Sequence, residues 1–438
     1  MVKPRARLKG RWFVMLFFGL LSFHLAVSCL FYGISIRGYF PSLHDGRGIW
    51  NYAKDSRKYD EEAVASLCVL RENGFLEWWK SRSKYWHVKY IALMYWLLKP
   101  VPLAAAPLNA VLWAVSFLLV FSISFLILEN EGIGLTVASV FSLFPSHLMD
   151  SIQLLQDPFY VLGALMFIQS WVWTWKGAEE RKDTPVRWLP CMVFAAFGFY
   201  LVVKMRLYLM FAWLGMAFLF YLATLVRYPR RWIVLTGMIV AVLTVFFNVK
   251  PAKPVKPIKP AKPVKPVPIK KIYPWVYSRW VPDGIEGQLI RLARYRERFC
   301  TCCPHAGSNI DTSVRFHSVR DVVRYLPRAL EIGFLSPFPR FWFQRAKTSG
   351  RLARLIVGGE MVVLYLFYGG ILAWLIRKGV TFEWVMLFFW GAGFILLFSL
   401  VVVNLGTLHR MRHIYLLPVF IYGTGGWLSP WRRPDKFA

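Results

Sequence analysis

The stretch LNAVLWAVSFLLVFSISFLIL, residues Leu108–Leu128, decides the fold class, because it contains no charged side chain and is long enough to cross a bilayer as a helix. Similar apolar runs recur along most of the chain, and 57% of its 438 residues are hydrophobic. Within a bilayer, backbone polar groups must be satisfied inside the segment, which favours helices. The sequence therefore predicts an all-α integral membrane protein and argues against an ordinary soluble domain.

The charge of the chain is strongly basic, with 54 Lys and Arg residues against 23 Asp and Glu residues and a net charge of +31. Such an excess usually indicates nucleic acid, but the hydrophobicity argues against it, and we expect no nucleic-acid partner. Five basic residues precede the apolar stretch that begins at Trp12, so the positive-inside rule places the N-terminus in the cytoplasm. That stretch is too long for a signal peptide, and we expect an uncleaved first span.

About ten spans account for the apolar pattern and leave both termini in the cytoplasm. The expected spans are residues 12–36, 108–128, 133–149, 158–175, 188–203, 207–226, 232–248, 355–376, 383–403 and 414–428. The basic loops 176–187 and 227–231 then fall inside, as the rule requires. Trp86–Leu98 is too short to span, and we expect a helix that lies in the outer membrane interface.

Four parts follow from this pattern. Residues 1–249 form an N-terminal transmembrane module with a first external loop at 37–107, and residues 351–438 form a C-terminal transmembrane module. Residues 250–270 are a Lys-Pro repeat, and residues 271–350 are an extracytoplasmic segment that contains an interfacial helix. The prolines exclude helix and sheet, so the repeat is expected to form polyproline II. We interpret it as a solvated spacer; a binding tract for an anionic glycan or partner is the alternative.

The cysteines outside the expected spans allow disulfides on an oxidising side of the membrane. They are Cys68, Cys300, Cys302 and Cys303. A bridge from Cys68 would tie the first external loop to the later external segment, but the sequence does not decide the pairing. The CxCCxH stretch that ends at His305 matches no common zinc spacing, so we expect no metal site there.

Acidic residues are scarce, so those on the expected external side are candidates for chemistry. Asp45 and Asp55 lie in the first external loop, and Asp157 lies in a later external turn, shortly after Asp150. Each has a simpler interpretation as a helix cap, above all Asp157, which directly precedes Pro158. The functional interpretation assigns catalytic roles to Asp45, Asp157 and Asp55.

Basic side chains are expected at the same membrane face. Arg206 and Lys204 interrupt one pair of spans, and Arg410 and Arg412 lie in the last external turn. Charged side chains at membrane boundaries often only extend to the aqueous interface, but guanidinium groups also bind phosphate oxygens bidentately. We therefore predict that these residues bind a phosphate, and that Arg206 and Arg410 meet at one outward-facing cavity. Candidates for acceptor or sugar contact are His44, Gln156, His409 and His413.

Taken together, these features resemble the GT-C glycosyltransferase superfamily, and among its members the bacterial protein mannosyltransferases and lipid A aminoarabinose transferases. Asp45, Trp50 and Ala53 are similar to the family's D-(E/G)-x-x-Y-x-x-x-A pattern. The turns Pro145–Asp157 and Arg410–Arg412 complete the resemblance. The chain departs from it in three ways: Gly46 stands where many members have a second acid, Ile49 replaces the usual tyrosine, and the Lys-Pro repeat has no counterpart.

The resemblance implies a GT-C-like fold in a bacterial cytoplasmic (inner) membrane, with the active site facing the periplasm or exterior. It implies transfer of a sugar from a polyprenyl-phosphate-linked donor to a hydroxyl of a glycan, lipid or protein, such as a secreted or pilus protein. Asp45 would take the hydroxyl proton during an inverting attack, and Asp157 would assist or bind the acceptor or a metal. The arginines would hold the phosphate, no nucleotide-binding motif is present, and the need for a divalent metal stays open.

Two other functional classes remain on the sequence alone. An O-antigen-type ligase or polymerase would use the long external segment, which carries His305 and His317. A transporter or flippase for a lipid-linked sugar would favour internal repeats, and none is convincing here. A purely structural scaffold is disfavoured by the gathering of external acids and arginines.

Overall fold

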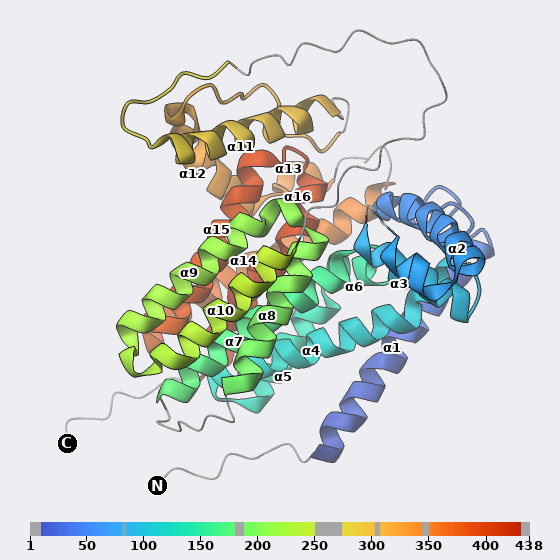
Figure 1. The fold of residues 1–438 in the computed structure, drawn as a ribbon, viewed down its shortest axis with the longest axis horizontal. Coiled ribbons are helices and arrows are strands. Elements are labelled where there is room, and N and C mark those ends of the chain that lie inside the picture. The colour runs from blue at the N-terminus through green and yellow to red at the C-terminus, as the bar shows by residue number, and fades with distance from the viewer. Residues whose placement is uncertain are drawn as a thin grey trace. The chain divides into compact units, whose positions relative to one another are not determined.

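The computed structural model describes residues 10–81, 83, 85–179, 188–249, 274–302, 307–343 and 350–430. These residues form helices joined by turns, and they contain isolated bridges but no extended strand. The chain divides into two compact units. Figure 1 labels most of the helices that belong to them. Unit 1 comprises Met1–Ala252, Phe367–Met386 and Val419–Ala438, and unit 2 comprises Lys253–Leu366 and Leu387–Pro418. The C-terminal module expected at 351–438 is therefore shared between the units.

Unit 1 is a helical bundle that carries a pair of helices from the first external loop. Its complete helices are α1 (Gly10–Ile36), α2 (Asp55–Lys80), α3 (Trp86–Leu97), α4 (Ala106–Leu128), α5 (Glu131–Leu143), α6 (Pro145–Ser151), α7 (Asp157–Glu179), α8 (Trp188–Met205), α9 (Met210–Arg227) and α10 (Trp232–Asn248). Helix α7 packs against α4 and α8 and is buried along nearly its whole length. Gly163 and Gly198 allow this approach, because a Cβ on Gly198 would lie 2.6 Å from the Gly163 carbonyl oxygen.

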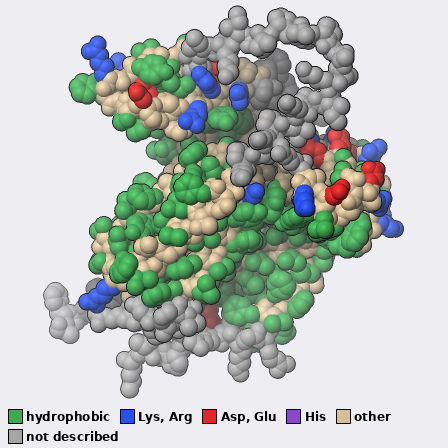
Figure 2. Space-filling view, viewed as in Figure 1, with side chains coloured by type: hydrophobic (Ala, Val, Ile, Leu, Met, Phe, Trp, Pro, Cys, Tyr) green, Lys and Arg blue, Asp and Glu red, His purple; other side chains and the backbone are tan. Residues whose placement is uncertain are grey.

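Seven segments are long and apolar enough to cross a membrane. They are Trp12–Ile36, Pro102–Leu128, Trp188–Met205, Leu207–Arg227, Pro229–Asn248, Ala353–Lys378 and Phe382–Val401. An eighth is obtained if α5 and α6, which are bent by 63° at their junction, form one broken span. An all-α, multi-pass membrane protein is thus confirmed, and hydrophobic side chains cover much of the unit 1 surface in Figure 2.

The full count of ten spans stays a prediction. The other two expected spans correspond to α7 and to α17 (Leu417–Leu428), and neither is among the segments that qualify by length and hydropathy. Helix α7 carries Gln169, Ser170 and Thr174, which are buried against protein, and α17 has only 12 residues. Polar residues of this kind are tolerated in a span that faces other helices and not lipid.

Contacts within unit 1 group its loops into two sets. In one set, the Trp50 amide donates to Gln153 Oε1 at 3.1 Å, and the Tyr52 hydroxyl donates to the Met149 carbonyl at 2.9 Å. In the other set, Lys176 lies 3.9 Å from Glu129 and 3.6 Å from Glu383. The sets match the two sides of the membrane expected from the charges. Which set faces the cytoplasm stays a prediction.

The helix expected at Trp86–Leu98 is present as α3, and it packs on α2. Its position at the membrane interface stays a prediction. Val88, Ile91 and Tyr95 are buried in a core shared by the two helices. The Lys89 ammonium donates to three backbone carbonyls at the C-terminal end of α2, those of Trp78, Trp79 and Ser81. Helix α2 itself is kinked at Gly74, whose φ of 76° lies in the left-handed region that glycine favours.

Unit 2 contains residues 271–350 and the turn at 404–413, both of which the charge pattern predicts to be external. Its elements are α11 (Asp283–Cys302), α12 (Val319–Leu335), α13 (Pro339–Trp342), α16 (Leu405–Arg412), and parts of α14 (Gly350–Lys378), α15 (Phe382–Val401) and α17. Arg296 is 1% exposed and donates to the carbonyls of Val314, Asp311 and Leu400. Residues 274–302 and 307–335 are thus folded around one buried guanidinium. The Lys-Pro repeat at 250–270 lies outside the described residues.

A second contact stabilises the same segment. The Asp311 carboxylate accepts hydrogen bonds from Arg328 and Tyr325, both at 3.0 Å. Burial would raise the pKa of Asp311, but these hydrogen bonds outweigh it, so the pKa is lowered. The buried face of α12 includes Val322 and Ile332, as expected for an amphipathic segment.

Candidate functional site

The first external loop is held by its own polar side chains. Asp45 Oδ1 accepts from the amides of Arg47 at 2.8 Å and Ile49 at 3.1 Å, and Asp45 Oδ2 lies 3.9 Å from Arg57 Nε. His44 is buried, its Nε2 bonds the Tyr39 carbonyl at 2.6 Å, and its Nδ1 accepts from the Gly46 amide at 3.1 Å. His44 therefore supports the loop. One carboxylate oxygen of Asp45, Oδ1, stabilises the loop through its amides, and the other, Oδ2, faces the Arg57 guanidinium.

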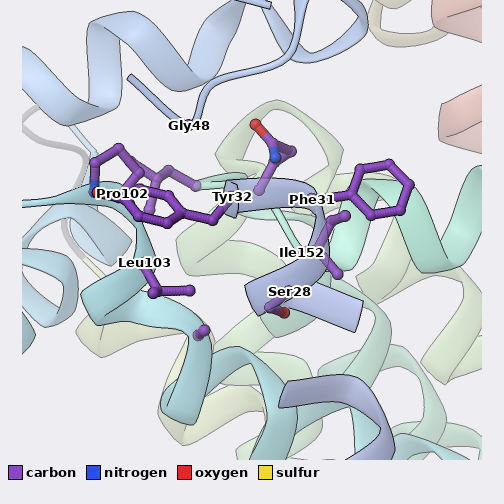
Figure 3. A pocket seen from close by; sticks show the side chains of 10 residues that line it. Ser28, Phe31, Tyr32, Gly48, Pro102, Leu103 and Ile152 are labelled. Atoms are coloured by element: carbon purple, nitrogen blue, oxygen red, sulfur yellow. The ribbon is translucent and has the colours of Figure 1, made fainter. Parts of the chain in front are cut away.

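A small cavity adjoins this loop (Figure 3). Its lining comes from α1, the first external loop, the start of α4 and the segment after α6, and includes Tyr32, Gly48, Pro102 and Gln153. The cavity measures about 10 Å³, which is room for one water at most. A Cβ on Gly48 would lie 2.6 Å from the Tyr32 ring, and its φ of 107° also favours glycine.

Asp157 and Arg206, which the sequence predicts at one membrane face, are in direct contact. Arg206 Nη2 lies 2.5 Å from Asp157 Oδ1, and the residues are 3% and 9% exposed. The guanidinium lies 4.3 Å from the centre of the Tyr160 ring, whose hydroxyl accepts from Trp213 Nε1 at 3.0 Å. This is a buried ion pair on an aromatic support.

His87, on α3, belongs to the surroundings of this pair and was not a candidate from sequence. It is 1% exposed, and burial lowers its pKa to about 4 against the opposite influence of Asp157. Its neighbour Trp86 contacts Phe159 of α7 with 6.3 Å between ring centroids. The first external region therefore packs directly beside the Asp157 end of α7.

The remaining unit 1 candidates lie near the same end. Lys204 is half-buried, with its ammonium 5.5 Å from the centre of the Tyr200 ring. The Gln156 carbonyl accepts from the Tyr160 amide at 3.2 Å and opens α7. Asp55 is exposed and is the first residue of α2, where a carboxylate favours the helix dipole.

In unit 2, the Arg-rich turn forms a buried chain of hydrogen bonds. Arg412 is fully buried and donates to the Gly333 carbonyl at 2.5 Å. Its Nη2 lies 3.0 Å from His409 Nδ1, and His409 Nε2 lies 2.7 Å from Glu360 Oε2. Arg412 and His409 are thus engaged with their own unit. Glu360, inside the apolar segment Ala353–Lys378, escaped the sequence analysis, although a lone acid in a span is itself a signal.

Arg410 and His413 flank this chain. Arg410 is half-buried on α16, and His413 is buried in the short turn that follows. Arg206 belongs to unit 1 and Arg410 to unit 2. Their expected meeting at one cavity therefore stays a prediction.

Asp60 is a second carboxylate that sequence reasoning missed. It is half-buried on α2, and its Oδ1 accepts from the Tyr95 hydroxyl at 2.5 Å. Burial raises the pKa of Asp60. The sequence contained no signal for this contact, because it depends on how α2 packs against α3.

The described residues include some of the side chains for which metal binding or a disulfide was considered. Among the described residues, no group of three or more His, Cys, Asp or Glu side chains is placed to hold a metal. Cys68 and Cys300 are free thiols, while Cys303 and His305 lie outside the described residues. The need for a divalent metal stays open.

The fold and its apolar helices define an all-α, multi-pass membrane protein. No family model, no characterised protein and no solved structure matches the chain.

Proposed function

We propose that the protein is a membrane glycosyltransferase that moves a sugar from a polyprenyl-phosphate-linked donor to an acceptor hydroxyl outside the cytoplasm. The observation that carries the proposal is the buried Asp157–Arg206 pair, which lies beside the first external region of unit 1. Buried ions are costly at membrane depth and usually mark a functional site. A guanidinium is also the side chain best shaped for a phosphate.

The ion pair suggests how the donor would bind. Asp157 Oδ1 occupies a position on Arg206 that a phosphate oxygen can take, because both are anionic oxygen acceptors. The donor phosphate would replace or share this contact, with Lys204 adding charge at the same end. The Tyr160 ring keeps the guanidinium in place throughout.

The chemistry requires a base and a stabilised leaving group. The acceptor oxygen attacks the anomeric carbon, the carbon–oxygen bond to phosphate breaks, and the electron pair stays on the phosphate. Arg206 would stabilise that charge as it develops. External carboxylates, with Asp45 as the candidate from sequence, would take the hydroxyl proton. A bacterial cytoplasmic membrane, with the site on its outer face, is the proposed location.

A flippase for a lipid-linked sugar is the second candidate, and one observation favours it. Helices α5 and α6 form a pair bent by 63°, and broken helices are typical of transporters. We prefer transfer, because carboxylates beside a phosphate-binding arginine serve chemistry, which transport does not need.

The test uses the full chain in nanodiscs with undecaprenyl-phosphate mannose, glucose or aminoarabinose, and an extract of bacterial envelope as acceptor. We expect release of undecaprenyl phosphate and sugar incorporation from at least one donor, and loss of both in Arg206→Met. Arg71→Met, at an exposed position of α2, is the matched control. Movement of intact donor across sealed liposomes, without release from any donor, would favour the flippase instead.

A further inference from the structure

Asp60 differs from the other external carboxylates in how it is held. It shares a face of α2 with the buried residues Ser56 and Ala63, and its partner Tyr95 is 1% exposed. Within the described part of the chain, Tyr95 is its one hydrogen-bond partner, through Oδ1, so Oδ2 remains available. A carboxylate fixed by one neutral donor is oriented without being neutralised.

Asp60 and Asp45 are neighbours. Arg57, which lies 3.9 Å from Asp45, is three residues before Asp60 on α2, so the two carboxylates flank one helical turn. Burial is the largest influence that raises the pKa of Asp60, and the charges of Asp45 and Glu61 raise it further. The Tyr95 hydrogen bond and the charge of Arg47 act in the opposite direction.

Tyr95, the partner of Asp60, is linked to the cavity of Figure 3 through Tyr32. Tyr32 lines that cavity, and it is near enough to Tyr95 to influence the Tyr95 pKa, which burial raises first of all. Asp45 lies three residues before Gly48, which also lines the cavity.

We propose that Asp60 is the general base of the transfer reaction and that Asp45 is the neighbouring negative charge that tunes it. This inference rests on the proposed glycosyltransferase function. Asp45 Oδ1 accepts two loop amides and its Oδ2 faces the Arg57 guanidinium at 3.9 Å. Within the described residues, Asp60 accepts only from Tyr95 and forms no ion pair, so its Oδ2 is the better placed to take a proton. Two carboxylates in unlike surroundings commonly divide their roles in this way.

Asp60 Oδ2 removes the proton of the acceptor hydroxyl while that oxygen bonds to the anomeric carbon. The bond from that carbon to the donor phosphate oxygen breaks, and its electron pair leaves with the polyprenyl phosphate. The proton on Asp60 then passes to water or to the departing phosphate. No oxidant, reductant or cofactor is needed.

The first test compares Asp60→Asn with Glu72→Gln, a matched loss of one negative charge at an exposed position of α2. Asparagine still accepts from Tyr95, so the fold should survive. We expect turnover in Asp60→Asn to fall by about 10²–10⁴-fold, the usual contribution of a general base. Binding of undecaprenyl phosphate, used as the probe, should change less than about threefold, and Glu72→Gln should match the parent.

The second test reads the pH dependence of turnover. Turnover should fall as the pH drops through the pKa of Asp60, because a protonated carboxyl accepts no proton. Tyr95→Phe removes a donor that lowers this pKa, so the acidic limb should move to higher pH. Asp45→Asn removes a negative charge that raises it, so the limb should move to lower pH. A purely structural Asp60 would give neither shift.

The outcomes separate the two proposals. A parent protein that releases no undecaprenyl phosphate from any donor overturns the glycosyltransferase function, and the role of Asp60 with it. An active parent with a folded Asp60→Asn variant that keeps more than about a tenth of its turnover overturns the role of Asp60 alone. If Asp60→Asn does not fold, the role of Asp60 is tested by the opposite pH shifts expected for Tyr95→Phe and Asp45→Asn. If the acidic limb of the turnover profile shifts in neither variant, Asp60 is not the general base.

Discussion

Arg206 and Arg412 are both buried arginines, but each meets its carboxylate differently. Arg206, in unit 1, touches Asp157 directly at 2.5 Å and lies over a tyrosine ring. Arg412, in unit 2, reaches Glu360 through the neutral ring of His409, and it also bonds a backbone carbonyl of α12. A direct pair can be opened by an incoming anion. A relay that joins three helices mainly fixes their packing. We therefore expect the proposed donor to bind at Arg206, and Arg412 to hold the helices of unit 2 together.

Arg412→Met should produce the largest change in stability. It would leave the Glu360 carboxylate buried without its compensating charge, at a cost of about 3–5 kcal/mol in the free energy of unfolding. The measurement is thermal unfolding of the purified protein in a fixed detergent. Arg324→Met, at an exposed position of α12, is the control and should change stability by less than about 0.5 kcal/mol.

The double variant Arg412→Met with Glu360→Leu sharpens this test. Removing both charges leaves no uncompensated ion, so the double variant should be considerably more stable than Arg412→Met alone. Equal destabilisation by the single and double variants would show that the guanidinium acts through Gly333 and not through Glu360.

Arg206→Lys should lower the affinity for the donor by about tenfold, equivalent to about 1.4 kcal/mol of binding free energy. The affinity for the acceptor should change little. Lysine keeps the charge but loses the two-pronged geometry that fits a phosphate. Competition by undecaprenyl phosphate in the transfer assay measures the effect. Arg412→Lys is the comparison, and we expect it to lower the free energy of unfolding more than the free energy of donor binding. A larger effect of Arg412→Lys on donor binding than on stability would contradict the distinction between the two arginines.

Tyr160→Phe should have a smaller effect. The ring under Arg206 remains, but the hydrogen bond from Trp213 is lost. This loss should lower the free energy of unfolding by about 0.5–1.5 kcal/mol. We expect donor affinity to fall by about two- to threefold. Tyr160→Leu, which also removes the ring, should be worse; if both variants bind donor equally, the aromatic support has no role.

Shortening the Lys-Pro repeat by two repeats should have the smallest effect. Each lysine near an anionic surface contributes at most about 1 kcal/mol to membrane attraction and nothing to the reaction itself. Turnover on a soluble acceptor analogue should stay within about twofold. A loss above about tenfold would instead assign acceptor recognition to residues 250–270.

The sequence predicted the helical membrane class because apolar runs are a local property. It also placed Asp157 and Arg206 at one face, and the structure brings them into contact. Alternation of spans was enough for this, since adjacent loops on one side of a bilayer have few places to lie.

Contacts between distant segments were not predictable. Glu360 and His409 are 49 positions apart, and their bond depends on how α14 and α16 pack. Asp60 was passed over because Asp45 carried the family resemblance, while the value of Asp60 depends on a tyrosine from the next helix. Single-sequence patterns describe which face of a helix is buried, but not which partner covers it.

The burial of α7 has a consequence for the synthesis of the protein. A helix that carries Gln169, Ser170 and Thr174 is a weak substrate for insertion on its own hydropathy. It emerges from the ribosome after α4, which it contacts, and before α8, whose Gly198 meets its Gly163. We therefore expect that α7 enters the bilayer in cooperation with these neighbours, so that a bulky residue at Gly198 would act first as a defect of membrane insertion.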